Sequence, residues 1–327
     1  MQSFSTKKHW RTWVRGTLGL LFGALFLWLA LRQTSLTEVS RILSQSHEGW
    51  LMVALGCYSI SMVVRIVRWQ TLLQDVKAFS FRKVGTALLI GYAANNLLPA
   101  RLGEIFRADF VGRRHRVSRS AIAASILLER VLDGLVVVSC LILGRAFIPN
   151  QPVLLNTLSI TGMLTFCSIF LLLWLLGRGY GVKWLTRFPP AITSRVQSFR
   201  KGLSVRRTSS FSKAISLSLV IWLLEGLALW SILRSVQVSL AWQQILTILG
   251  VTSLSTLIPS APGYVGTYQY AYAFTLNLFG YEPAQGIAAA TAFQVFLFGS
   301  VTLIGLGLYL YISLLKPQPP SEMNGQK

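Results

Sequence analysis

The chain has 327 residues, of which 53% are hydrophobic and 13% are charged, which is too little charge to cover the surface of a soluble protein. Lysine and arginine outnumber aspartate and glutamate by 31 to 10, but they fall in loops between apolar runs, so the excess indicates membrane topology and not nucleic-acid binding. We therefore expect an all-α, polytopic integral membrane protein.

Six apolar runs are long enough to cross a bilayer as full helical spans. They cover residues 14–31, 50–73, 121–144, 153–176, 214–233 and 285–315. Arg65 and Arg68 lie near the end of the second run. Long basic side chains at such a position can extend to the lipid headgroups, and we interpret both arginines in that way.

Two further apolar runs are shorter, and each ends in a polar stretch broken by proline. Residues 84–98 and 243–257 would each rise about 22 Å as a helix, less than the roughly 30 Å hydrocarbon core. Shifting the sequence by 160 positions places residues 95–103 over 255–263, so that a leucine, a proline and a glycine coincide. We predict that each run is one arm of a re-entrant helical hairpin; the alternative is a pair of kinked, full-length helices.

The distribution of charge predicts the side from which each hairpin enters. Basic residues flank the first hairpin on both sides, with Lys77, Arg82 and Lys83 before it and Arg113 and Arg114 after it, so it enters and leaves from the cytoplasm. No lysine or arginine occurs between residues 235 and 315. The second hairpin, residues 243–278, is therefore expected to enter from the outside, with both chain termini in the cytoplasm.

These elements form one transmembrane domain with two halves of inverted topology. We assign residues 1–148 to the first half, residues 149–316 to the second and residues 317–327 to a polar tail. The second half includes a basic cytoplasmic segment, residues 178–213, with nine lysines and arginines and no acid. Apolar residues at helical spacing within it predict an amphipathic helix on anionic phospholipid; a nucleic-acid arm is disfavoured, because aromatic stacking residues and a binding fold are missing.

An inverted repeat places the two hairpin tips opposite each other around a central site. The ionisable residues Glu129, Arg130 and Asp133 in residues 121–144, and Glu225 in residues 214–233, are costly in a bilayer unless they are paired or hydrated. They serve either substrate binding or a structural salt-bridge cluster. The candidate binding residues are Asn95, Asn96, Arg101, Glu104, Arg107, Glu129, Arg130, Asp133, Glu225, Tyr264 and Tyr268. The candidate helix-breaking residues are Pro99, Gly103, Pro259, Pro262, Gly263 and Gly266.

Three motifs follow one another in the chain: Asn95-x3-Pro99-x-Arg101-x-Gly103-Glu104-x2-Arg107, then Glu129-Arg130-x2-Asp133, then Pro259-x2-Pro262-Gly263-x2-Gly266. In these motifs the chain resembles, over nearly its whole length, the transmembrane region of lysylphosphatidylglycerol synthases, the bifunctional MprF proteins. The resemblance implies a flippase module, since a separate soluble domain performs aminoacyl transfer in those proteins and this sequence ends at Lys327 without one. Gln269 departs from the acidic residue of many members, which puts a paired-acid mechanism at that position in doubt.

The leading hypothesis is a translocase without enzymatic activity or cofactor in the bacterial cytoplasmic membrane. Its substrate would be a lipid with a polar headgroup, such as an aminoacyl phospholipid or a polyprenyl-linked sugar, with Arg101, Arg107 and Arg130 holding the phosphate. One alternative is a membrane transferase acting on lipid headgroups, with Glu129 or Asp133 as base. Another is a non-transporting partner of an envelope glycosyltransferase or lipid synthase.

Overall fold

The computed structural model describes residues 21, 24–32, 34–98, 102–148, 152–180, 189–203, 208–258 and 260–315. Every regular element in these ranges is a helix, which agrees with the predicted class. Pro99, Arg101, Pro259, the tail at residues 317–327 and half of the first predicted span lie outside the described residues.

Four helical stretches in the described ranges are long and apolar enough to cross a membrane. They are α3 (Glu48–Leu72), α7 (Val153–Arg178), α10 (Thr208–Ser235) and the run Pro283–Leu314. Helix α6 (Arg119–Arg145) has 27 residues, about 40 Å at 1.5 Å per residue, but ionisable groups occupy its interior. The chain is a multi-pass membrane protein, and the number of six spans stays a prediction.

Helices α3 and α10, one from each predicted half, pack against each other in antiparallel orientation along the molecule. Near one end the His47 backbone N–H donates to the Ser235 carbonyl oxygen (2.9 Å). Near the other end the Ser210 hydroxyl donates to Gln74 Oε1 (3.2 Å). Polar contacts at both ends and ion pairs between them make this helix pair the centre of the fold.

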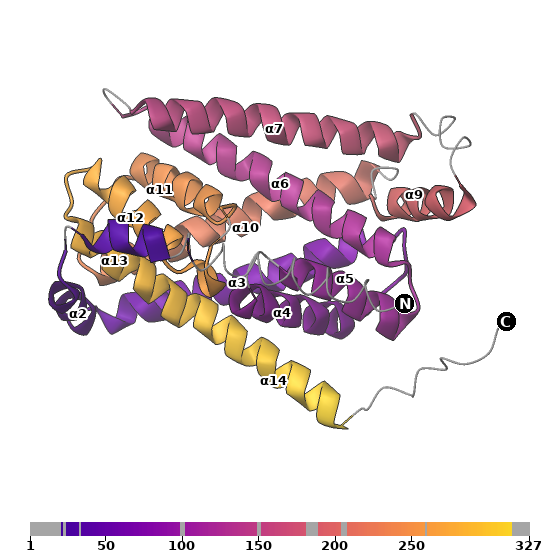
Figure 1. Ribbon diagram of the computed structural model, residues 1–327, viewed down its shortest axis with the longest axis horizontal. Helices are drawn as coiled ribbons and strands as arrows, with labels where there is room; N and C mark the ends of the chain where they lie inside the picture. The colour runs from indigo at the N-terminus through magenta and orange to yellow at the C-terminus, as the bar shows by residue number, and fades with distance from the viewer. Residues whose placement is uncertain are drawn as a thin grey trace, which may run out of the picture.

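Each segment predicted to be a hairpin forms a pair of short helices that pack against each other, and re-entry into the membrane stays a prediction. Helix α4 (Phe81–Leu97) packs against α5 (Leu102–His115), and α11 (Trp242–Ser255) packs against α12 (Thr267–Asn277). With 17 and 14 residues, α4 and α11 rise about 26 and 21 Å, less than the bilayer core. Figure 1 shows the α4–α5 pair toward one end of the long axis and the α11–α12 pair toward the other.

Each hairpin also crosses a long helix of the other half at a glycine. Helix α14 (Gly299–Leu315) crosses α4 where a Cβ on Gly305 would collide with the Leu89 carbonyl oxygen. Helix α11 crosses α6 where a Cβ on Gly144 would collide with the Gln243 carbonyl oxygen. The two crossings therefore correspond, because each joins a short helix of one predicted half to a longer helical stretch of the other.

The last membrane-length stretch is one continuous run with an irregular turn. Helix α13 (Pro283–Ala292) passes through a π-helical segment, η3 (Phe293–Phe298), into α14. A π-helical turn rotates the side chains that follow it relative to a regular α-helix and often occurs near functional sites. Here it lies beside the second hairpin.

The remaining helices lie at the periphery. Helix α2 (Leu36–Ser44) packs against α13, and α9 (Pro190–Gly202) packs against α6. The predicted amphipathic helix in the basic segment is thus present, but its apolar side contacts protein: Phe199 packs against the core and Leu203 is fully buried. The expectation that this side lies on the membrane surface is wrong for these two residues.

Candidate functional site: a cavity where two broken helices meet

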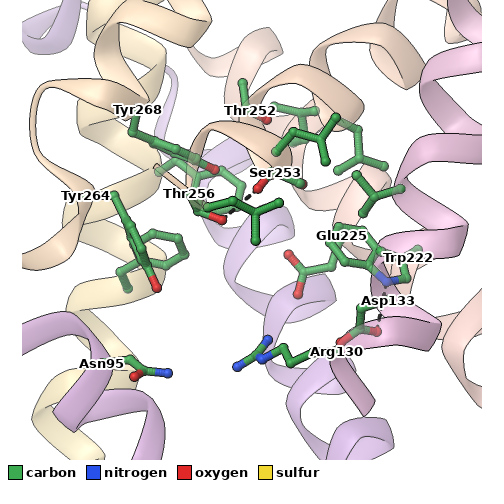
Figure 2. A pocket seen from close by; sticks show the side chains of 18 of the residues that line it. Asn95, Arg130, Asp133, Trp222, Glu225, Thr252, Ser253, Thr256, Tyr264 and Tyr268 are labelled. Carbon is green, nitrogen blue, oxygen red and sulfur yellow. Dashed lines mark hydrogen bonds between the residues drawn. The ribbon is translucent and has the colours of Figure 1, made fainter. Parts of the chain in front are cut away.

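A cavity of about 180 Å³ lies where the ends of α4 and α11 approach each other. The two breaks are adjacent, because a Cβ built on Gly263 would lie 3.6 Å from the Asn96 carbonyl oxygen. Charged residues of α3, α6 and α10 line part of the cavity, while hydroxyl and aromatic groups from α11, η2 (Pro262–Tyr264) and α12 line much of the rest (Figure 2).

Arg65 of α3 holds the charged side together. Its guanidinium donates to Glu225 Oε1 on α10 (2.9 Å) and to the Tyr92 hydroxyl on α4 (3.1 Å). It also lies 3.7 Å from Asp133 Oδ2 on α6. The Ser61 hydroxyl donates a second hydrogen bond to Glu225 (3.0 Å). One arginine therefore joins three helices at the cavity wall.

A second, fully enclosed set of ion pairs lies behind that wall. Arg68 donates to Asp133 Oδ1 (2.5 Å) and to Glu129 Oε1 (2.9 Å), and Arg107 donates to Glu129 Oε2 (2.8 Å). The Arg107 guanidinium also lies 3.4 Å from the centre of the Trp69 ring, a cation–π contact. Arg68 and Glu129 are both 0% exposed, so both depend on these ion pairs for charge compensation.

Arg130 is the least buried guanidinium of the set. It donates to Glu104 Oε1 (2.7 Å), and about a quarter of each side chain is exposed. The set contains four arginines (Arg65, Arg68, Arg107 and Arg130) and four carboxylates (Glu104, Glu129, Asp133 and Glu225). It is therefore balanced in formal charge, which low-dielectric surroundings demand.

The uncharged side offers hydroxyl groups set among aromatic rings. Thr252, Ser253 and Thr256 come from the end of α11, and Tyr264 and Tyr268 follow the break (Figure 2). The Tyr268 ring packs against Phe293 and Phe298 of η3, with ring centres 5.8 and 5.7 Å apart. These rings give the cavity a rigid, partly apolar wall with polar edges.

Amide hydrogen bonds hold the second break open. Gly263 and Gly266 have φ of +67° and +92°, a region that favours glycine. The Gly266 N–H donates to Gln269 Oε1 (2.8 Å), and Gln269 Nε2 donates to Gln294 Oε1 (2.5 Å). Gln294 Nε2 then donates to the Gly263 carbonyl oxygen (2.7 Å). A closed chain of neutral hydrogen bonds thus links the loop to η3.

The structure brings seven of the predicted binding residues to the cavity: Asn95, Asn96, Arg130, Asp133, Glu225, Tyr264 and Tyr268. Asn96 Nδ2 is already used, since it donates to Thr302 Oγ1 on α14 (2.9 Å). Asn95 is 7% exposed, and its Oδ1 accepts no hydrogen bond from the described residues. Figure 2 shows its amide nitrogen turned toward the space into which Arg130 also points, with the oxygen on the other side.

Three predicted binding residues do not line the cavity. Glu104 pairs with Arg130 near its edge, while Arg107 and Glu129 belong to the enclosed set. The expectation that Arg107 holds a phosphate in the site is therefore wrong for this conformation, because its guanidinium is bound to Glu129 and Trp69. Gly103 was also predicted to break a helix; it lies in the first turn of α5, where a Cβ would collide with the Asn95 backbone nitrogen.

The interpretation of Arg65 and Arg68 as headgroup-directed side chains is wrong. They are 5% and 0% exposed, and both form ion pairs inside the helix bundle. Their partners lie 61 to 160 positions away in sequence, so no local pattern identifies them. Tyr58, Tyr92 and Trp222 also line the cavity and were missed. Acidic residues outnumber basic residues in 121–144 and 214–233. This was the one sequence feature indicating that cations from other helices lie buried beside these acids.

The arrangement provides cations, carboxylates and several hydroxyls around a small polar space. Arg65 and Arg130 are the guanidinium groups that line it, which makes them the available donors for a phosphate oxygen. Asp133 and Glu225 are the available acceptors for an ammonium group. Within the described ranges, no group of three histidine, cysteine or acidic side chains is placed to hold a metal ion.

The chain is similar in sequence to known membrane proteins. The family model of the lysylphosphatidylglycerol synthase transmembrane region matches residues 16–305. A UPF0104 membrane protein of Methanocaldococcus jannaschii is 23% identical over 70% of this chain and 98% of its own length. Similar proteins from Pyrococcus horikoshii and Methanothermobacter thermautotrophicus, named in the same way, are 22% and 24% identical, each over 88% of this chain and over 93% and 89% of their own. The chain is a member of the lysylphosphatidylglycerol synthase transmembrane-region family.

Proposed function

We propose that this protein is a lipid translocase that passes a polar headgroup through the central cavity while the hydrocarbon chains stay in the bilayer. The observation that carries the proposal is the cavity itself, a charged and hydroxyl-lined space between membrane-length helices at the meeting point of two helix breaks. Polar groups at membrane depth are costly, and they commonly mark a substrate pathway. This function rests on the chain's own residues and needs no cofactor or catalytic step.

The proposal includes re-entrant hairpins and an inverted repeat. Two observations support it: α4 and α11 are too short to cross the hydrocarbon core, and the two hairpins lie toward opposite ends of the molecule (Figure 1). Packing gives further support, since α4 contacts α14 and α11 contacts α6. Each of these contacts joins the short helix of one half to a long helix of the other, as expected if residues 1–148 and 149–316 form an inverted repeat. Broken helices at corresponding places in two such halves are typical of transporters with a central site.

In the proposed mechanism the phosphate of the lipid competes with carboxylates for cavity-facing guanidinium groups. Arg130 is the more available of the two, because its partner Glu104 is itself partly exposed. The α11 hydroxyls then receive the donor groups of the headgroup. The cavity volume of about 180 Å³ is below the roughly 300–1,000 Å³ of ordinary ligand pockets, so a large headgroup requires the hairpin tips to separate.

The test is lipid movement in vesicles that contain the purified protein. Vesicles would carry headgroup-labelled phosphatidylglycerol, aminoacyl phosphatidylglycerol or a polyprenyl-linked sugar, and accessibility of the label to a membrane-impermeant quencher would be followed over time. Wild-type protein should accelerate the movement of at least one of these lipids over protein-free vesicles. Arg130→Gln should slow it at least tenfold, whereas Arg41→Gln, an exposed arginine of α2, should not. Equal rates for wild-type protein and Arg130→Gln would contradict the proposal.

The orientation is also proposed: a bacterial cytoplasmic membrane with both termini in the cytoplasm, as the basic loops indicate. Arg116 is an exposed residue just beyond α5. A single cysteine in its place should react with an impermeant thiol reagent only after the membrane has been permeabilised, so that the reagent reaches the cytoplasmic face. Reaction in intact cells would place the end of the first hairpin outside and refute re-entry from the cytoplasm.

A further inference from the structure

A second hollow lies outside the central cavity, between one face of α5 and the C-terminal part of α14. Its volume is about 350 Å³. Figure 1 shows α14 diverging from the bundle in this region. Helix α14 contacts α4 so closely at Gly305 that a Cβ there has no room, and the residues of α14 that line the hollow come after this contact in the chain. No residue lines both hollows, so we treat this hollow, here named the α5–α14 groove, as a separate site.

The groove has an apolar floor and a basic rim. Phe106 and Phe110 of α5 stack with ring centres 6.0 Å apart, and Phe106 contacts Tyr309 of α14 edge-on at 5.9 Å. Two turns further along α5, Arg113 and Arg114 line the same groove. The combination of aromatic rings and adjacent guanidinium groups suits an amphipathic anion and not a free ion alone.

The charge at the rim is not balanced, unlike that of the central set. Asp109 is the acidic residue lining the groove, and it is shared between Arg113 (2.7 Å) and Arg119 (2.8 Å). Arg114 forms no ion pair with a described residue, and its guanidinium lies 5.9 Å from the centre of the Phe110 ring. Three guanidinium groups thus face one carboxylate, which leaves positive charge available to an anionic ligand.

We infer that the α5–α14 groove binds one anionic phospholipid, with its phosphate on Arg114 and an acyl chain along Phe106 and Tyr309. The position fits this occupant, because α14 belongs to a membrane-length stretch and the groove's rim carries the basic residues expected at the cytoplasmic leaflet. The chain's own residues 316–327 follow α14, but they contain Lys316, Glu322 and Lys327. That net positive charge does not complement the rim.

The experiment uses native mass spectrometry of the purified, delipidated full chain. It is titrated with phosphatidylglycerol or with phosphatidylcholine of the same acyl chains. Wild-type protein should bind one phosphatidylglycerol about tenfold more tightly than phosphatidylcholine. Arg114→Gln should weaken phosphatidylglycerol binding about tenfold, as expected for loss of one charged hydrogen bond. It should weaken phosphatidylcholine binding less, because the choline cation already offsets the attraction of that lipid's phosphate to the basic rim. Arg116→Gln, which removes a nearby charge just beyond α5 and outside the groove, should bind like wild type.

Further variants distinguish a lipid in the groove from a lipid bound elsewhere on the protein. Ser313→Trp, which fills the groove without changing charge, should lower the binding of both lipids, while Arg130→Gln in the central cavity should keep the high-affinity phosphatidylglycerol. Unchanged melting temperatures would show that all variants are folded. Equal weakening by Arg116→Gln, displacement of the lipid by inorganic phosphate, or a dimer abolished by Ser313→Trp would each overturn the inference.

Discussion

The two helix breaks have matching positions in the sequence but are stabilised by different chemistry. Around the first, between α4 and α5, four arginines and four carboxylates join α3, α5, α6 and α10. At the second, between α11 and α12, the described residues of α11, η2 and α12 themselves carry no formal charge, and hydrogen bonds from the side-chain amides of Gln269 and Gln294 hold the loop. The difference shows that a break in a membrane helix can be stabilised either by ion pairs between helices or by hydrogen bonds from side-chain amides within one region.

The two solutions have different energetic consequences. An ion pair in low-dielectric surroundings contributes little net stability, but removing one partner leaves the other charge uncompensated. Loss of a hydrogen bond from a side-chain amide leaves only a neutral polar group without a partner. Substitutions around the first break should therefore be far more damaging than those around the second, and single variants at each break can test that order.

Glu129→Ala should have the largest effect. It leaves both Arg68 and Arg107 without this shared partner, and we expect a loss of about 3–5 kcal/mol in the free energy of unfolding. Thermal unfolding in detergent, together with the yield of monodisperse protein, would measure it. Glu104→Gln, at the partly exposed Arg130 pair, is the matched control and should cost about 1 kcal/mol or less. Glu129 is consequently a poor position for testing transport without unfolding, contrary to the interpretation of it as a substrate-binding residue.

Gly305→Ala should have an intermediate effect at the crossing of α14 and α4. The new methyl group would meet the Leu89 carbonyl oxygen and Ala93, and overpacking of this kind costs about 1–3 kcal/mol. Gly307→Ala is two residues away on the same helix, where a Cβ meets nothing within 4 Å. It should be neutral or stabilising by up to about 1 kcal/mol. Equal melting temperatures for the two variants would show that this crossing is not close-packed.

Gln294→Leu should have a smaller effect at the second break. It leaves the Gly263 carbonyl oxygen and Gln269 Nε2 without their described partner, at a cost of about 1–2 kcal/mol. Gln244→Leu removes an exposed cap bond to the Ala241 N–H at the outer end of the same hairpin and should cost less. A loss for Gln294→Leu as large as that of Glu129→Ala would erase the proposed difference between the breaks.

Asp109→Asn should have the smallest effect. Its ion pairs with Arg113 and Arg119 lie at the surface, where those two arginine side chains are about 60% exposed, and such pairs contribute about 0–1 kcal/mol. The change in melting temperature should shrink further as salt is added, because exposed charges are screened. A large, salt-independent loss would mean that this carboxylate has a role that the described contacts do not show.

Local sequence features were sufficient to predict the helical class, the two broken segments and seven of the residues that line the cavity. Pro262, Gly263 and Gly266 identified the second break because proline and positive-φ glycine have local causes. The roles of Arg65 and Arg68 could not be read locally, because a headgroup-directed arginine and a paired one look identical until the facing helices are known. Gln294 was missed for a related reason: its position depends on the π-helical turn of η3, which apolar periodicity does not reveal.

The antiparallel pair of α3 and α10 limits how the molecule can change shape. Each helix belongs to a different half, and hydrogen bonds connect them near both ends, at Ser235 and at Gln74. Any rearrangement that widens the cavity must therefore either rotate the two halves about the axis of this helix pair or break one of those terminal contacts. Arg65 and Glu225 join the two helices of the pair, so their separation would change little during such a rotation. A distance probe placed across them would be a poor reporter of opening, whereas one joining Asn96 to Tyr264 would follow it directly.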